Sequence, residues 1–272
     1  TGLNFTYDKY SEFVNLNDVS RINNSVGTFF EYTFDNNDKF SAVLGARIDY
    51  HNRLGLFFTP RFHAKYIPWE KGVLRFSAGR GKRAANIFAE NQQYFASSRT
   101  ISILDSDGKI YGLNPEIAWN YGISFTQNFQ LFGKKADVTL DFYRTDFQNQ
   151  VVVDVMQSPQ YVLFYDLKGK SFANSLQVDF NYEILKHFNL RSAYKYYDIS
   201  TDYLSGNFQR PIQAKHRIFA NLEYETHQKE NGSQWKFDFT TNWLGKQQLP
   251  NTKTNAAADS FPEFSPSFAV MN

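Results

Sequence analysis

The amino-acid sequence predicts an all-β fold in which antiparallel strands form an up-and-down barrel that crosses a membrane. Three observations support this prediction: apolar and polar side chains alternate through most of the chain, aromatic residues make up 18% of it, and short connections alternate with longer ones. Strict alternation is typical of β-strands with two different faces, and we count about twelve such strands. No segment has a convincing helical periodicity.

The stretch from residue 39 to residue 51 alternates almost without a break. One face carries Phe40, Ala42, Leu44, Ala46, Ile48 and Tyr50, and the other carries Ser41, Gly45, Arg47, Asp49 and His51. In a soluble sandwich the apolar face would pack into a protein core, whereas in a membrane barrel it would contact lipid. We expect the membrane arrangement, with Ala42, Leu44, Ala46 and Ile48 toward lipid and with Arg47 and Asp49 in the lumen.

The same alternation recurs along the chain, so one kind of strand accounts for most of the molecule. It is visible over residues 3–8, 25–34, 56–66, 74–79, 116–126, 137–142, 172–184, 188–196, 218–224 and 235–243, and a last segment starts at residue 267. A soluble meander would also alternate. The membrane barrel is favoured because the polar faces carry many charged residues and because several strands reach the roughly 9 to 11 residues of a tilted span.

The aromatic residues are the second observation. The 28 Phe, 17 Tyr and 4 Trp residues exceed what one soluble core requires. Girdles of aromatic side chains at the two interfaces of a membrane would use them. The composition therefore favours a barrel that meets lipid on its outside.

The connections are the third observation. Short turns at 35–38, 68–71, 132–135, 185–187 and 229–232 alternate with mostly longer, polar connections at 15–23, 84–114, 201–212 and 248–265. Every second connection of a meander lies at the same end, so one end is predicted to be trimmed and the other elaborated, as in outer-membrane barrels. The short link at 51–55 is an exception on the elaborated side.

Composition excludes several classes of protein. A content of 42% hydrophobic and 21% charged residues is not that of a disordered chain, and a mean hydropathy of -0.51 is not that of a helical membrane protein. The net charge is only +2 and the basic residues are dispersed, so nucleic acid is not an expected partner. Without Cys there is neither a disulfide framework nor a thiolate metal site.

Five segments resemble barrel segments of TonB-dependent outer-membrane receptors. They are LRFSAGRGKRAANIFAEN (74–91), LNPEIAWNYGISF (113–125), DFYRTDFQNQVVVD (141–154), KSFANSLQVDFNYEI (170–184) and PIQAKHRIFANLEY (211–224). The most specific features are Asn-Pro-Glu entering a strand after a long loop and Gln-Ala-Lys-His-Arg opening another strand. The resemblance extends over nearly the whole chain.

The resemblance implies a 22-stranded barrel around an N-terminal plug, located in the bacterial outer membrane. Residues 1–272 are then expected to be part of a single barrel domain, with the plug domain and the C-terminal strands absent from the sequence. An open sheet of this kind would expose two unpaired edges. The N-terminal residues show neither a basic nor an apolar signal region, so we expect that any export signal has been removed or that the chain begins within a longer protein.

The function implied by the resemblance is energised uptake of a scarce nutrient: a ferric siderophore, haem, cobalamin or another metal complex. Expected partners are that small-molecule chelate, outer-membrane lipid and lipopolysaccharide, and TonB through the plug region. No enzymatic activity and no cofactor is implied. The alternatives are an outer-membrane enzyme barrel of the lipase or protease kind and a passive porin or adhesin.

The candidate ligand-binding residues lie where a strand enters the longest connection. They are Arg80, Lys82 and Arg83, followed by Asn86, Phe88, Glu90, Asn91 and Tyr94. Guanidinium groups suit the carboxylate or phosphate groups of an anionic chelate. The same cations would also suit lipopolysaccharide phosphates, or would simply keep the loop soluble.

No metal site or catalytic group is predicted. Asp105, Asp107 and Gly108, with Glu116 further on, have the composition of a calcium loop but not its spacing, so an ordinary turn is favoured. The five His residues lie far apart in the sequence without a metal-binding spacing. Neither a nucleophile elbow nor a phosphate-binding glycine loop is present.

Overall fold

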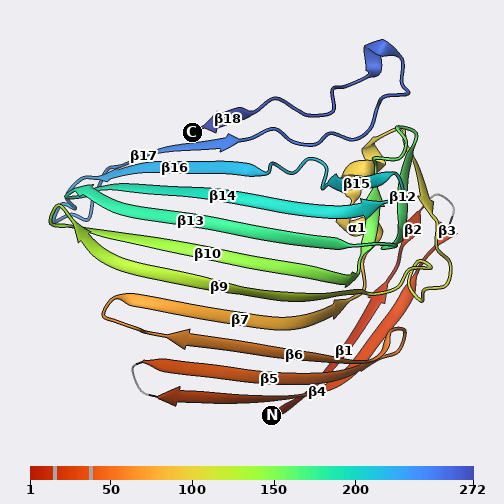
Figure 1. Ribbon diagram of the computed structural model, residues 1–272, viewed down its shortest axis with the longest axis horizontal. Helices are drawn as coiled ribbons and strands as arrows, with labels where there is room; N and C mark the ends of the chain where they lie inside the picture. The colour runs from red at the N-terminus through yellow and green to blue at the C-terminus, as the bar shows by residue number, and fades with distance from the viewer. Residues whose placement is uncertain (15–16, 37–38) are drawn as a thin grey trace.

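A computed structural model describes residues 1–14, 17–36 and 39–272, and one curved antiparallel sheet dominates it (Figure 1). Of its 13 strands, twelve lie side by side in the order β1-β4-β5-β6-β7-β9-β10-β13-β14-β16-β17-β18, and β15 pairs with β14. The twelve are β1 (Gly2–Tyr10), β4 (Arg21–Asn36), β5 (Phe40–His51), β6 (Gly55–Tyr66), β7 (Gly72–Arg83), β9 (Glu116–Leu131), β10 (Lys134–Asn149), β13 (Ser171–Leu185), β14 (Phe188–Tyr203), β16 (His216–Glu225), β17 (Lys236–Leu244) and β18 (Phe268–Met271). The predicted all-β meander of about twelve strands is confirmed.

The two ends of the sheet differ as predicted. Tight turns join β6 to β7, β9 to β10 and β13 to β14 at one end, where Lys71, Phe132 and His187 adopt positive φ values of 66°, 51° and 66°. The longer connections gather at the opposite end, on the right of Figure 1. We call this the loop end. The predicted turn at 35–38 includes Asn37 and Asp38, which lie outside the described residues.

Two of the predicted long connections have shifted bounds: residues 11–20 join β1 to β4, and residues 204–215 join β14 to β16. β4 already begins at Arg21, inside the predicted 15–23 loop. Residues 201–212 contain the end of β14 and the short strand β15 (Gly206–Gln209), because the chain turns at Gly206 with a φ of 136° and pairs back on β14. Between β1 and β4 the chain also forms β2 (Phe13–Val14) and β3 (Asn17–Asp18).

The two faces of the sheet are separated as the alternation predicts. In β5, Leu44, Ile48 and Tyr50 are 54%, 46% and 56% exposed and lie outside any protein core, whereas Asp49 on the opposite face is 2% exposed. Arg47 donates to Asp49 at 2.6 Å on that polar face. We call the large sheet the wall, and its two sides the apolar face and the polar face. Every strand of the wall contributes to both faces.

Close packing of charged groups on the polar face explains why residue 45 is a glycine. Gly45 lies between Glu31 on β4 and Arg61 on β6 in the register of the sheet. A Cβ at Gly45 would lie 2.5 Å from Nε of Arg61, whose guanidinium pairs with Glu31 across the intervening strand. The missing side chain therefore lets an ion pair span three strands.

A second, smaller sheet lies in the connections at the loop end. It consists of β8 (Thr100–Ile103), β12 (Tyr161–Asp166) and β11 (Val151–Asp154), in the order β11-β12-β8. The prediction of no helix is wrong here: the β7–β9 connection contains α1 (Ile87–Glu90) and a 3-10 helix at Gln92–Ala96, and another follows at Ala257–Asp259. These pieces are too short for a helical periodicity to show in the sequence. Within the described ranges, no helix has both the length and the hydropathy needed to cross a bilayer.

Candidate functional site

The connections 84–115 and 150–170 fold together into a compact unit at the loop end, which we call the loop assembly. Its centre is apolar: Val155, Val162 and Phe164 are 1%, 0% and 1% exposed, and Ile87 and Leu113 from the other connection pack with them. The parallel pairing of β12 with β8 joins the two connections through their backbones. Burial of these side chains makes the loop assembly an ordered structure rather than a set of separate loops.

A buried carboxylate fixes the loop assembly to the end of the wall. Asp154, 1% exposed, accepts hydrogen bonds from the backbone nitrogens of Met156 and Gln157 at 2.7 and 3.1 Å and from the hydroxyl of Tyr165 at 2.8 Å. The hydroxyl of Tyr165 also accepts from the nitrogen of Leu204, which directly follows β14, at 3.1 Å. Burial, and then the bond to Asp154, raises the pKa of the Tyr165 phenol above its usual value.

Arg99 ties the loop assembly to the connection between β17 and β18. One guanidinium nitrogen lies 3.1 to 3.4 Å from the carbonyl oxygens of Val155, Ser158 and Tyr161, and the other donates to the carbonyl of Asn251 at 3.2 Å. A planar fork of donors suits such a cluster of carbonyl oxygens. Arg99 therefore has a structural role in joining three connections.

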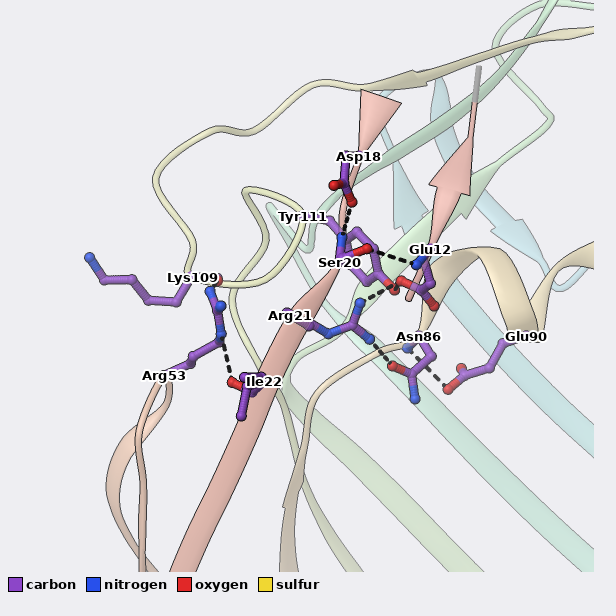
Figure 2. A network of polar contacts seen from close by, with 10 residues as sticks. All are labelled: Glu12, Asp18, Ser20, Arg21, Ile22, Arg53, Asn86, Glu90, Lys109 and Tyr111. Carbon is purple, nitrogen blue, oxygen red and sulfur yellow. Dashed lines mark hydrogen bonds and ion pairs between the residues drawn. The ribbon is translucent and has the colours of Figure 1, made fainter. Parts of the chain in front are cut away.

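A buried ion pair between Arg21 and Glu12 joins the loop assembly to the start of β4 (Figure 2). Arg21, at the start of β4, donates to Glu12 and to the side-chain oxygen of Asn86, at 2.5 Å in each case. Its guanidinium lies 4.1 Å from the ring centre of Tyr10 and 4.6 Å from that of Tyr111. The hydroxyl of Tyr111 donates to Glu12 at 2.5 Å. We call Glu12, Arg21, Asn86 and Tyr111 the latch, because they hold the 84–115 connection against β4.

The latch is poorly accessible to water. The side chains of Arg21 and Glu12 are 4% and 18% exposed. Burial, followed by the bond to Glu12, raises the pKa of the Tyr111 phenol above its usual value, so the phenol stays protonated and donates to the carboxylate. Removing one member of such a pair leaves an uncompensated buried charge.

Of the predicted ligand residues, Arg83 and Glu90 come together. The Arg83 guanidinium makes two bonds to Glu90 at 2.8 and 2.9 Å and pairs with Glu116 at 2.6 Å, while Glu90 also accepts from the backbone nitrogen of Asn86. Glu116 begins β9, so this ion pair closes the base of the long connection. In the described structure both carboxylates already occupy the Arg83 donors.

The predicted residues further along this connection make internal contacts. The Asn91 side chain donates to the carbonyl of Ile87 at 2.8 Å. Phe88 lies edge-on to Tyr111 at 5.3 Å between ring centres, and Tyr94 packs on the apolar centre of the loop assembly. These contacts order the connection, and the sequence alone does not distinguish them from contacts to a ligand.

The structure separates Arg80 from Arg83, although the two residues lie only three positions apart in the sequence. In the ladder with β9, Arg80 lies opposite Trp119 on the apolar face, whereas Arg83 lies opposite Glu116 on the polar face. Arg80 donates to Gln148 at 3.0 Å and to the carbonyl of Phe58 at 3.2 Å, and Lys82 donates to the carbonyl of Leu54 at 2.9 Å. The predicted cluster is therefore divided by the pleat of one strand.

Pro60 explains why the side chains of Arg80 and Lys82 bond to backbone carbonyl oxygens. The ladder between β6 and β7 ends at the pair of Arg61 and Gly79, next to Pro60, which has no N–H to donate. Beyond this point Arg80 and Lys82 bond to carbonyl oxygens of residues 58 and 54. Their side chains thus take over part of the bonding that the ladder would have provided.

The acidic turn considered as a calcium loop makes contacts of another kind. Asp105 accepts from the backbone nitrogen of Asp166 at 2.6 Å and from the ammonium of Lys168 at 2.8 Å, so it joins the two halves of the loop assembly. Throughout the described residues, no three His, Asp or Glu side chains are grouped so that they could hold a metal ion.

The geometry defines a class of protein: a two-faced antiparallel wall with tight turns at one end and an ordered loop assembly at the other. The family described as TonB dependent receptor-like, beta-barrel matches residues 1–272. The chain belongs to this family, whose members are outer-membrane proteins. No curated protein matches the chain.

Solved structures of three siderophore receptors share the fold. A mutant of the ferric enterobactin receptor PfeA from Pseudomonas aeruginosa aligns with a TM-score of 0.63 and 14% identity over 94% of this chain and 37% of that protein. FpvA of P. aeruginosa, bound to a heterologous pyoverdine, gives 0.63 and 15% over 94% and 32%. The siderophore receptor PirA from Acinetobacter baumannii gives 0.63 and 13% over 93% and 39%. The chain thus spans only about a third of the length of these receptors.

Proposed function

We propose that this chain forms part of the wall and the external loops of an outer-membrane receptor that imports a metal chelate of the siderophore class, energised through TonB. The observation that carries the proposal is the ordered loop assembly at one end of a wall whose apolar face is exposed. A rigid, cross-linked set of loops is pre-organised for binding, since little further ordering is needed when a ligand arrives. The family and the siderophore receptors that share its fold support the same function.

The exposed apolar face supports the membrane location. Large apolar side chains such as Leu44, Tyr50 and Phe58 remain 54%, 56% and 45% exposed, which is costly in water and favourable in lipid. In an outer membrane this face would contact acyl chains, with lipopolysaccharide in the outer leaflet. The loop end would then face the outside and the tight turns the periplasm.

The ligand is proposed to bind beside the loop assembly, near Arg83 and near the residues Asn86, Phe88, Glu90, Asn91 and Tyr94 of the β7–β9 connection. An anionic chelate would compete with Glu90 and Glu116 for the Arg83 guanidinium. Among proteins that share this fold, a PfeA mutant has been solved in complex with enterobactin and FpvA has been solved bound to heterologous pyoverdines. Chelates of these two kinds are the probes to use.

The proposal is tested by shortening the long connection in the complete receptor. Residues 92–108 are replaced by a short glycine-rich linker, and equilibrium binding of ferric enterobactin and of a ferric pyoverdine is measured on the purified protein. We expect binding of the recognised chelate to fall at least about tenfold while the barrel still assembles, because β7 and β9 keep their own ladder.

The matched control shortens the hairpin at 228–233, which lies at the opposite end of the wall. This variant should bind the chelate as the unmodified receptor does. Unchanged binding after loss of 92–108 would show that the binding determinants lie elsewhere. Equal loss in both variants would show that shortening acts through the stability of the barrel.

A further inference from the structure

Two cations lie directly opposite each other on the polar face of the wall. Lys195, near the middle of β14, is the register partner of Arg217 on β16. The same row continues to Gln177 on β13 and to Leu244 on β17. Like charges at directly opposed positions of a sheet repel each other. The pair is therefore unfavourable unless a negative charge is brought to it.

The part of the chain that the structure describes does not supply this negative charge. Among its ion pairs, none includes Lys195 or Arg217. The next cation on the same face of β14 that has a partner is Arg191, which pairs with Glu223. The Nε atom of Arg217 is also buried without a hydrogen-bond partner within the described residues. Such an unsatisfied group calls for an explanation, and a bound ligand is one.

An aromatic ring holds the two cations in place. The ammonium of Lys195 lies 4.6 Å from the ring centre of Tyr197, and the guanidinium carbon of Arg217 lies 5.7 Å from it. The face of an aromatic ring attracts cations through its quadrupole, which carries no net charge. The ring of Tyr197 therefore positions both cations without neutralising them.

A hollow of about 320 Å³ adjoins the two cations. Its lining combines the cations with two side-chain amides and with apolar groups, among them Lys195, Arg217, Gln177, Asn242, Phe219 and Leu244. Phe219 and Leu244 occupy polar-face positions, because they alternate with Ile218 and Trp243 of the apolar face. The volume is at the lower end of the range for ligand pockets, so the hollow suits a small molecule or one arm of a larger one.

We propose that this hollow binds a small organic anion, with its carboxylate at Lys195 and Arg217 and its apolar body against Phe219 and Leu244. An ammonium and a guanidinium both donate charge-assisted hydrogen bonds to a carboxylate. An inorganic ion would use the two cations but would leave the apolar side of the hollow in contact with water. The occupant therefore has both a negative charge and an apolar body. This site does not depend on the proposed function.

The test is calorimetric titration of the complete protein, in mild detergent, with benzoate, acetate and benzamide. Benzoate has a carboxylate and an apolar ring, acetate lacks the ring, and benzamide lacks the charge. We expect benzoate to bind, and acetate and benzamide to bind at least about tenfold more weakly, because each loses one of the two kinds of contact.

Three double variants locate the binding. K195Q/R217Q should weaken benzoate binding at least about tenfold, because both charge-assisted contacts are lost. K195R/R217K keeps both charges and should retain most of the affinity. The control K65Q/R75Q removes another directly opposed pair of cations on the polar face, between β6 and β7, and should bind benzoate as the unmodified protein does. Heat-modifiable migration of each variant confirms that the barrel is folded.

Several outcomes overturn the proposal. They are the absence of benzoate binding, equal affinity for benzamide, undiminished binding in K195Q/R217Q, and equal loss in K65Q/R75Q or in K195R/R217K. Equal affinity for acetate would show a simple anion site and would refute the organic occupant.

A second titration identifies the source of the anion. Benzoate binding is measured again with ferric enterobactin or a ferric pyoverdine present. Competition would indicate that an arm of the chelate occupies the hollow, and its absence would indicate a separate organic acid, so that both results support the site. Benzoate binding by a protein that binds neither chelate would count against the receptor function and leave this site standing.

Discussion

Leu44 and Val43 are neighbours in β5 whose side chains point to opposite faces of the wall. Leu44 lies between Tyr32 and Phe62 on the apolar face, and Val43 lies between Thr33 and His63 on the polar face. This division follows directly from the pleat and could be predicted from the sequence, because it depends only on residue spacing. What a residue contacts across the loop end could not be predicted in this way.

Leu44→Arg tests the assignment of the faces. We expect it to lower the free energy of unfolding of the complete receptor in lipid vesicles by about 2 to 4 kcal/mol, since it puts a charge on the lipid face near the midplane. Val43→Arg introduces the same side chain one residue away and should cost clearly less. Denaturant unfolding of both variants measures the difference. A larger cost for Val43→Arg would reverse the assignment.

The latch provides a second prediction for single residues. Glu12→Gln keeps the shape of the side chain but leaves the buried Arg21 charge unpaired, at a cost of about 3 kcal/mol to the local structure. Hydrogen exchange in residues 84–115 should therefore become faster. Glu31→Gln removes a partner from the exposed pair with Arg61, which should cost about 0 to 1 kcal/mol and leave that exchange unchanged. Equal exchange in the two variants would mean that the latch does not hold the connection.

At the scale of elements, the long wall strands could be predicted and the loop assembly could not. Residues 150–170 contain the runs Val151–Asp154 and Tyr161–Asp166, which have the composition of strands. The sequence therefore does not indicate that these residues form a second long connection. β12 pairs with β8 about sixty residues away, and no local signal specifies such a partner. Similarly, Arg80, Lys82 and Arg83 are adjacent in sequence, but the strand pleat and the interrupted ladder at Pro60 direct them apart.

Phe164→Ala tests whether the loop assembly is one packed unit. Phe164 is 1% exposed at its centre, so we expect a loss of about 3 to 5 kcal/mol, confined to residues 84–115 and 150–170. Limited proteolysis should cut these connections faster while the heat-modifiable barrel persists. Tyr161→Ala, on the same strand at a position that is 47% exposed, is the control. Resistance like that of the unmodified protein would show that the connections are ordered by other contacts.

At the scale of the whole molecule, the residues that the structure describes form a wall without a dry core between two layers. Most of the buried apolar side chains belong to the loop assembly, while the wall strands expose theirs. The strand order of the large sheet begins at β1 and ends at β18, so these two strands form its edges (Figure 1). Unpaired strand edges are not tolerated in the hydrocarbon of a membrane. We therefore propose that, in a membrane, lipid covers the apolar face and further strands pair with the two edges of the wall.

The most direct test of the receptor function is the uptake of radioactive iron by iron-starved cells that produce the complete protein at matched surface levels. Iron is supplied as ferric enterobactin and as a ferric pyoverdine, with and without collapse of the proton gradient. If the proposed function is right, uptake of at least one chelate requires the protein and stops when the gradient collapses, because transport would then be energised through TonB. Uptake of both chelates that is the same in cells lacking the protein, or that continues without the gradient, would contradict it.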